Sequence, residues 1–218
     1  SNCGSSNLKF MIPEHDNIKR YCCQDCDSIF YTNPNNVVGA LCIRDNKILM
    51  AKRDINPRKG LWTLPAGFME NAETLQEGAI RETFEETGSK AKIKMAYSMF
   101  SLPHINQVHM FFLADLLDDN YGPTFESSDV RLFDIDEILW DEIAFPTVKK
   151  TLEYYIKDLK KGNFIFREFW TCFCILGTLS SILWQLSNYY NGEEQQIVEY
   201  KKFNEIQTDR YPSLALCW

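Results

Sequence analysis

A short run of acidic side chains is the part of this sequence best suited to chemistry. Glu82, Glu85 and Glu86 fall close together in an apparent helix. At about 100° of rotation per helical residue, Glu86 lies roughly 40° and Glu85 roughly 60° from Glu82, so the three carboxylates share one arc. A solvated acidic face is the simplest explanation of such a run. Oxygen donors on a rigid helix are also the ligands that Mg²⁺ and Mn²⁺ prefer.

Local signals define the ends of that helix. Thr74 and Glu77 form a T-x-x-E capping box, which places the first helical residue at Leu75. Gly88 suits the left-handed position just past the last turn. We therefore expect a helix from about Leu75 to Thr87.

The two sides of this helix are expected to differ. Gly78 lies on the acidic arc and leaves space above it. Ile80 and Phe84 point the other way, and we expect them to face a core.

The stretch from Gly67 to Gly88 resembles the Nudix box, G-x5-E-x7-R-E-U-x-E-E-x-G-U, in which U is usually apolar. All seven fixed letters of the box are met, over 22 residues: Gly67, Glu73, Arg81, Glu82, Glu85, Glu86 and Gly88. The two U positions hold Thr83 and Ser89, a mild departure that leaves the carboxylates intact. The resemblance covers about three quarters of the chain, from about Cys3 to Phe166.

This resemblance implies a metal-dependent hydrolase that cleaves a nucleoside diphosphate linked to another moiety. Glu82, Glu85 and Glu86 would hold Mg²⁺ or Mn²⁺, and the backbone carbonyl of Ala66 would be a further ligand. Glu85 and Glu86 would also take part in catalysis. Four residues of the box would be structural, two of them through a salt bridge: Gly67, Gly88, and the pair Glu73 and Arg81.

Three residues outside the box are candidates for catalysis or substrate contact. Glu126 lies where an assisting glutamate of the family falls, although an ordinary loop carboxylate explains it equally well. Arg53, at a strand end, is a candidate for substrate phosphate, and simple solubility explains it about as well. Trp62 is able to stack on a base or flavin, but so close to a sheet a tryptophan is more often part of the core.

Two sequence features bear on the substrate. Residues 98–107 lack the S-Q-P-W-P-F stretch of family members selective for NADH. Pro103 lies fifteen residues past Gly88, as a proline often does in members that act on ADP-ribose. With residues 31–34 and 131–138, the chain is most similar to zinc-ribbon Nudix enzymes that cleave FAD and ADP-ribose and release AMP. A nucleoside-triphosphate or dinucleoside-polyphosphate hydrolase and a non-catalytic nucleotide sensor remain alternatives.

Cysteines near the start of the chain suggest a second metal. Cys23 and Cys26 form a C-x2-C knuckle, and Cys3 precedes it by 20 residues. The resemblance implies a zinc-ribbon remnant whose first cysteine lies upstream of Ser1, and three thiolates bind zinc less well than four. Buried free thiols are the alternative. Because the cysteines are not spaced as a secreted disulfide scaffold, we expect a reducing, intracellular compartment.

The remaining elements must position these residues. A hairpin around Asp45-Asn46 and a second helix from Pro146 to Lys161 are the clearest. Strands are expected at residues 37–44, 47–52, 91–101, 107–117 and 130–134. Strands flanked by two helices predict an α+β fold, a Nudix-type α/β/α sandwich with the zinc-ribbon remnant at its N-terminal end.

We expect three segments: a zinc-ribbon-like segment (1–35), a Nudix hydrolase domain (36–166) and a C-terminal extension of unknown role (167–218). Residues 169–192 carry no charge and are long enough to span a bilayer, but polar residues interrupt them, so we favour an extension without membrane contact. The net charge of −7 disfavours nucleic acid as a partner. A small-molecule nucleotide is therefore the expected partner, and a homodimer is left open.

Overall fold

A computed structural model describes residues 2–170 of the chain. The expected uncharged segment 169–192 lies almost wholly outside the described residues. Within residues 2–170, no helix is long and apolar enough to cross a membrane.

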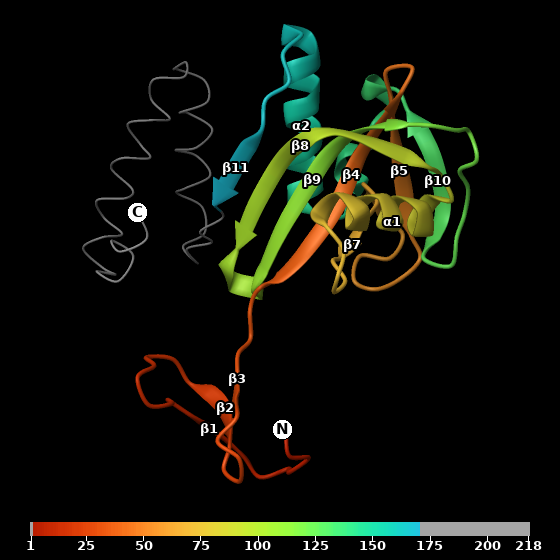
Figure 1. Ribbon diagram of the computed structural model, residues 1–218. Coiled ribbons are helices and arrows are strands. Elements are labelled where there is room, and N and C mark those ends of the chain that lie inside the picture. Colours follow the sequence, from red (N-terminus) through yellow and green to blue (C-terminus); the bar gives the residue numbers. More distant parts are fainter. Residues whose placement is uncertain (1, 171–218) are drawn as a thin grey trace, which may run out of the picture. The chain divides into compact units, whose positions relative to one another are not determined.

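The central element is an eight-stranded mixed sheet with the order β10-β5-β4-β9-β8-β11, in which β6 pairs with β5 and β7 with β4 (Figure 1). Its strands are β4 (Asn35–Arg44), β5 (Lys47–Arg53), β6 (Trp62–Thr63), β7 (Ala66–Phe68), β8 (Ala91–Leu102), β9 (Gln107–Leu116), β10 (Ser127–Phe133) and β11 (Arg167–Trp170). The pairs β4/β9 and β8/β11 are parallel, and the other pairs are antiparallel. Three 3₁₀ turns connect strands and helices: η1 (Pro103–Ile105), η2 (Ile135–Glu137) and η3 (Trp140–Glu142).

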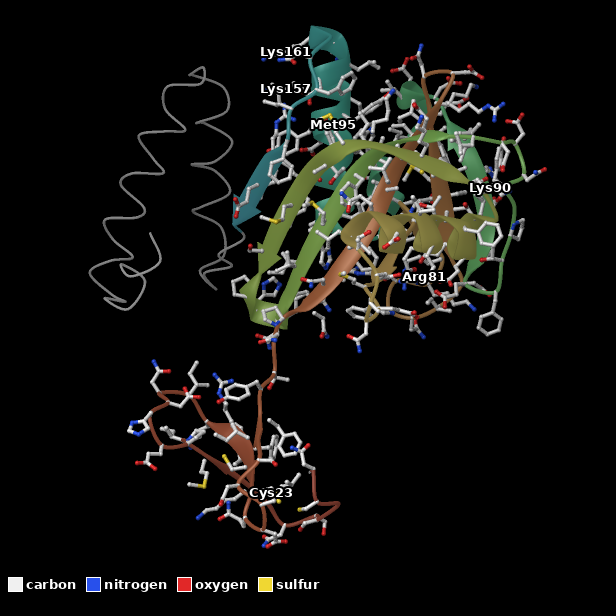
Figure 2. All side chains as sticks on the ribbon, viewed as in Figure 1. Cys23, Arg81, Lys90, Met95, Lys157 and Lys161 are labelled. Carbon is white, nitrogen blue, oxygen red and sulfur yellow. The ribbon has the colours of Figure 1, made fainter. Side chains whose placement is uncertain are left out.

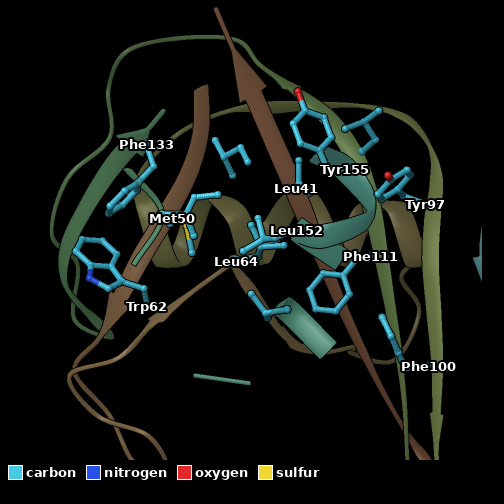
Figure 3. Close-up of a cluster of buried hydrophobic side chains, with 14 of the residues drawn as sticks. Leu41, Met50, Trp62, Leu64, Tyr97, Phe100, Phe111, Phe133, Leu152 and Tyr155 are labelled. Atoms are coloured by element: carbon cyan, nitrogen blue, oxygen red, sulfur yellow. The ribbon is translucent and has the colours of Figure 1, made fainter. Parts of the chain in front are cut away.

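Two helices cover opposite faces of this sheet: α1 (Leu75–Thr87) and α2 (Pro146–Lys161) (Figure 1). Side chains alternate between the faces along each strand. On β4, Leu41 packs in the cluster that includes Leu152 of α2 (Figure 3), whereas Cys42 lies on the α1 side, next to Thr83. The structure therefore confirms the expected α+β fold, an α/β/α sandwich.

The local signals in the sequence are present in the structure. The Thr74 hydroxyl accepts a hydrogen bond from the Glu77 amide at 3.2 Å, and the Glu77 carboxylate accepts one from the Thr74 amide at 2.8 Å. Gly88 ends α1 with a φ of 75°. The β4–β5 hairpin turns through Asp45 and Asn46, with φ of 49° and 62°.

One expectation about α1 is wrong. Ile80 and Phe84 are 37% and 53% exposed and do not face a core. The helix instead packs through small side chains, Ala79 and Thr83, which are fully buried. Small side chains let the helix approach the sheet closely, and Glu82 and Glu86 beside them are buried, whereas Glu85 of the acidic arc stays exposed.

Strand β11 begins just past the expected domain end at residue 166. Arg167 forms a bidentate ion pair with the buried Asp158 of α2, at 2.7 and 2.5 Å, and Tyr97 of β8 donates a hydrogen bond to the same carboxylate at 2.8 Å. The Phe169 ring stacks on Tyr154 and Phe100 at centroid distances of 4.8 and 5.1 Å. These contacts extend the sheet through Trp170, four residues beyond the expected boundary.

Residues 2–34 contain a small antiparallel sheet of three strands: β1 (Leu8–Met11), β2 (Arg20–Cys23) and β3 (Ile29–Phe30). Cys22 and Cys23 are consecutive in β2, so their side chains lie on opposite faces of this sheet.

Candidate functional site

Arg81 of α1, labelled in Figure 2, connects Glu82 and Glu85 of the acidic arc with Glu73. Its guanidinium makes a bidentate pair with Glu73, at 3.0 and 2.8 Å, so the expected salt bridge is present. The same side chain donates to Glu82 at 2.7 Å, to Glu85 at 3.0 Å and to the Phe68 carbonyl at 3.1 Å. The hydrogen bonds from Arg81 lower the pKa of Glu73 to about 2, which keeps this carboxylate ionised. Arg81 thus ties α1 to the β7 segment.

Glu86 is the most buried carboxylate of the arc, with 5% of its surface exposed. Its carboxylate accepts one hydrogen bond, from the Ala66 amide at 3.2 Å. Burial raises the pKa of Glu86 to about 8, and the nearby charges of Glu82 and Glu126 raise it further, while Arg53 opposes them. Burial also raises the pKa of Glu82. Nearby hydrogen bonds and positive charges only partly offset the negative charge of these two buried carboxylates, so their environment suits a cation.

Two glycines allow strand β7 to pack closely on both sides. Gly67 leaves room for Glu82 of the acidic arc, and Gly39 lets β4 approach β7. A Cβ at Gly67 would lie 2.3 Å from a carboxylate oxygen of Glu82. A Cβ at Gly39 of β4 would lie 2.4 Å from the Cβ of Ala66. The sequence analysis missed Gly39, although a glycine inside an apolar strand often marks a close backbone approach.

The loop that carries Glu126 is attached directly to the site. The Thr124 hydroxyl donates to the Glu86 carbonyl at 3.3 Å, and the Glu126 amide donates to the Thr124 hydroxyl at 3.3 Å. The Asp54 amide donates to the Glu126 carbonyl at 2.8 Å. The exposed Glu126 carboxylate is near enough to raise the pKa of Glu82 and of Glu86. Thr124 carries no signal in the sequence that could have identified it.

The two candidates for substrate contact, Arg53 and Trp62, have different surroundings in the structure. The Arg53 guanidinium packs over the Phe145 ring at 5.2 Å, and its Nε donates to the Pro57 carbonyl at 2.9 Å. The positive charge of Arg53 also lowers the pKa of Glu86. Trp62 is 2% exposed and packs edge-on against Phe133 with centroids 4.7 Å apart. This burial agrees with the core position that the sequence analysis favoured for Trp62 over stacking on a base.

The ribbon brings its three cysteines together. Ligand atoms of Cys3, Cys23 and Cys26 all lie within 4.8 Å of one another, and the first two sulfurs are 3.7 Å apart. Hydrogen bonds from Ser28 lower the pKa of Cys26 to about 6, which favours the thiolate that zinc requires. Cys22 lies on the opposite face of the ribbon, and its thiol donates to the Arg20 carbonyl.

The box glutamates are spaced differently from these cysteines. Among residues 2–170, the carboxylates of the arc do not gather within 4.8 Å as the three thiols do. Arg81 lies between Glu82 and Glu85 and supplies the positive charge there. The donor chemistry still fits a divalent cation, because the Glu86 carboxylate is buried beside like charges and accepts a single hydrogen bond within the described residues.

The α/β/α sandwich, with a capped acidic helix packed on the glycine-containing strand β7, agrees with the class of hydrolase that the sequence resembles. Family models agree: the NUDIX domain matches residues 33–155, and the Nudix N-terminal zinc ribbon matches residues 1–32. The chain therefore belongs to the Nudix family and is a Nudix hydrolase with an N-terminal zinc ribbon.

Named relatives differ in their substrates. The ADP-ribose pyrophosphatase of Methanocaldococcus jannaschii is 32% identical over 130 residues, which cover 57% of this chain and 75% of the relative. The NAD-capped RNA hydrolase NudC of Vibrio atlanticus is 30% identical over 143 residues, covering 65% of this chain. The chain spans 52% of that relative's length.

A solved Nudix structure is more similar in sequence. The NUDIX hydrolase from Nitrosomonas europaea is 44% identical, with a TM-score of 0.71. The match covers 75% of this chain and 94% of the solved one.

Proposed function

We propose that this enzyme cleaves the diphosphate of a nucleoside diphosphate linked to another moiety, with ADP-ribose and FAD as its substrates and AMP as one product. The observation that carries the proposal is the buried Glu86 carboxylate beside Glu82, held against the Ala66–Gly67 backbone. The archaeal ADP-ribose pyrophosphatase supports the choice of ADP-ribose. FAD rests on the resemblance to zinc-ribbon members of the family.

We infer that Glu82, Glu85, Glu86 and the Ala66 carbonyl hold Mg²⁺ or Mn²⁺. When bound, the metal would neutralise diphosphate oxygens and acidify a water molecule. Burial raises the pKa of Glu82 and of Glu86, so a bound cation would favour the ionised form of both carboxylates, which supports this inference. Arg81, braced by Glu73, would fix the orientation of Glu82 and Glu85.

The remaining residues have separate roles in this proposal. We propose that the Glu126 carboxylate accepts a proton from an attacking water. Its exposure and the attachment of its loop to α1 through Thr124 support this role. The Arg53 guanidinium carries positive charge on the α1 side, near Glu86, where it would orient a substrate phosphate.

A panel of nucleotides, each assayed with Mg²⁺ and with Mn²⁺, tests the proposal. The expected result is AMP from ADP-ribose and FAD, with little turnover of nucleoside triphosphates or dinucleoside polyphosphates. Binding of ADP-ribose without cleavage would instead support a nucleotide sensor. Turnover confined to triphosphates would overturn the choice of substrate.

NAD-capped RNA is a second candidate substrate. The similarity to NAD-capped RNA hydrolases favours it, and the zinc ribbon matched in residues 1–32 adds a module outside the hydrolase domain. Against it stand the net charge of −7 and the lack of an S-Q-P-W-P-F stretch in residues 98–107. The panel should include this substrate, and we expect its turnover to be well below that of ADP-ribose.

A further inference from the structure

Among residues 2–170, the buried indole N–H of Trp62 has no hydrogen-bond acceptor. The Trp62 side chain is 2% exposed, and no atom of this described part of the chain accepts a hydrogen bond from its Nε1. A buried polar group without a partner is destabilising, so folded proteins rarely leave one unsatisfied. The direction of the N–H is informative: in Figure 3 the indole nitrogen is turned away from Met50 and Leu64, toward the edge of the buried cluster.

Two cationic side chains lie over the same indole. Lys52 Nζ is 5.7 Å and Arg131 Cζ is 5.5 Å from the ring centroid. Lys52 is the direct cross-strand partner of Trp62, and Arg131 lies on β10, the next strand beyond β5. Arg131 also pairs with Asp129, but within the described part of the chain Lys52 has no carboxylate at ion-pair distance. Asp129 is also the direct cross-strand partner of Lys52, so this edge of β10, β5 and β6 carries two cations around one carboxylate.

This cluster is separate from the carboxylate site. On β5, Ile48 and Met50 belong to the core on the α2 side of the sheet, while Leu49 and Ala51 lie on the α1 side. Alternation therefore places Lys52 on the α2 side, and it places Arg53 on the side of Glu86. The side chains of Lys52 and Arg53 therefore lie on opposite faces of the sheet.

We propose that Trp62 Nε1, Lys52 and Arg131 form an anion site that binds a phosphate group. The indole N–H would donate to one phosphate oxygen, and the guanidinium and ammonium groups would donate to others. A phosphate has enough oxygens and charge for three donors on different strands. Cation–π contacts alone would account for the positions of Lys52 and Arg131, but they leave the N–H unsatisfied. The site depends on no part of the proposed diphosphatase activity.

The nitrogen-labelled full-length chain, free of divalent metal, provides a direct readout. The chain has five tryptophans, and the Trp62 indole signal is the one that disappears in Trp62→Phe. Inorganic phosphate, AMP and adenosine are each titrated at constant ionic strength, with sodium chloride as the control. The expected result is a saturable shift of the Trp62 signal with phosphate and AMP and none with adenosine. AMP that binds more than tenfold tighter than phosphate identifies a nucleotide as the source of the group, and equal affinities identify free phosphate.

Two variants of surface side chains complete the test. Lys52→Gln and Arg131→Gln should each weaken phosphate binding about tenfold, which corresponds to about 1.4 kcal/mol. Lys94→Gln, which removes a partly exposed cation paired with Asp115 on β9, should leave binding unchanged. The proposal is overturned if phosphate does not move the Trp62 signal, if chloride moves it equally, or if the Lys52→Gln/Arg131→Gln protein binds like the wild type. Unchanged amide spectra of the variants show that the fold is retained.

Discussion

Replacing Arg167 with methionine should destabilise the hydrolase domain strongly, although the residue lies beyond its expected end. Arg167 is the cation for Asp158, whose side chain is 1% exposed. Removing one partner of a buried ion pair costs about 3–5 kcal/mol, because an uncompensated charge remains buried. The Arg167 side chain retains 17% exposure, so we take the lower end, about 3 kcal/mol. For a domain of this size that loss corresponds to a fall in Tm of about 6–12 °C.

The pH dependence of this effect has a definite sign. Burial alone would raise the pKa of Asp158, but hydrogen bonds from Arg167 and Tyr97 hold it below its ordinary value of 3.8. In the wild type, this stabilisation is present at neutral pH and is lost as the pH falls through the lowered pKa. In Arg167→Met the buried Asp158 carboxylate loses its cation, so the pKa of Asp158 rises. The variant is destabilised only while Asp158 is ionised. The difference in Tm between the two proteins should therefore narrow as the pH falls from 7 toward 4.

Thermal unfolding of three proteins checks this reasoning. Asp158→Asn/Arg167→Met should recover part of the lost stability at pH 7, because its buried carboxylate has been removed. Lys94→Met, which breaks an exposed ion pair with Asp115, should change the stability by less than about 1 kcal/mol. An Arg167→Met protein with a Tm within 2 °C of the wild type would refute the assignment of β11 to the domain.

Two further predictions concern the metal sites. Cys23→Ser should abolish zinc binding as measured by elemental analysis, whereas Cys22→Ser, on the opposite face of the ribbon, should retain it; equal zinc in both variants would contradict the three-cysteine site. Gly67→Ala should displace the Glu82 carboxylate and weaken Mn²⁺ binding at least tenfold by calorimetry, because its Cβ would lie 2.3 Å from an oxygen of that group. Gly122→Ala has open space around its Cβ and should bind Mn²⁺ like the wild type.

Local signals in the sequence were sufficient for the elements that carry the site. The capping box at Thr74 and Glu77 and the glycine at residue 88 predict the ends of α1, since each acts through hydrogen bonds within a few residues. The Asp45-Asn46 turn similarly predicts the β4–β5 hairpin. The spacing of Cys23 and Cys26 predicts the knuckle, and the resemblance to zinc-ribbon enzymes adds Cys3.

Errors arose where packing between distant segments decides the outcome. Ile80 and Phe84 were expected in a core because they are apolar, but Ala79 and Thr83 allow closer contact with the sheet. The sequence favoured a core position for Trp62, but it could not identify the packing partner Phe133, which is 71 residues away along the chain. The attachment of β11 likewise depends on Asp158, whose pairing with Arg167 leaves no local pattern.

The most direct test of the central claim is the turnover of Glu86→Gln on ADP-ribose, measured with its Tm. The glutamine still accepts the Ala66 hydrogen bond and removes one of several crowded carboxylates, so the Tm should equal or slightly exceed that of the wild type. Turnover should nevertheless fall by about 10²-fold or more, as when an enzyme loses one preorganised electrostatic group. A Glu86→Gln protein with wild-type turnover would contradict the account, because the buried carboxylate would then have no part in catalysis.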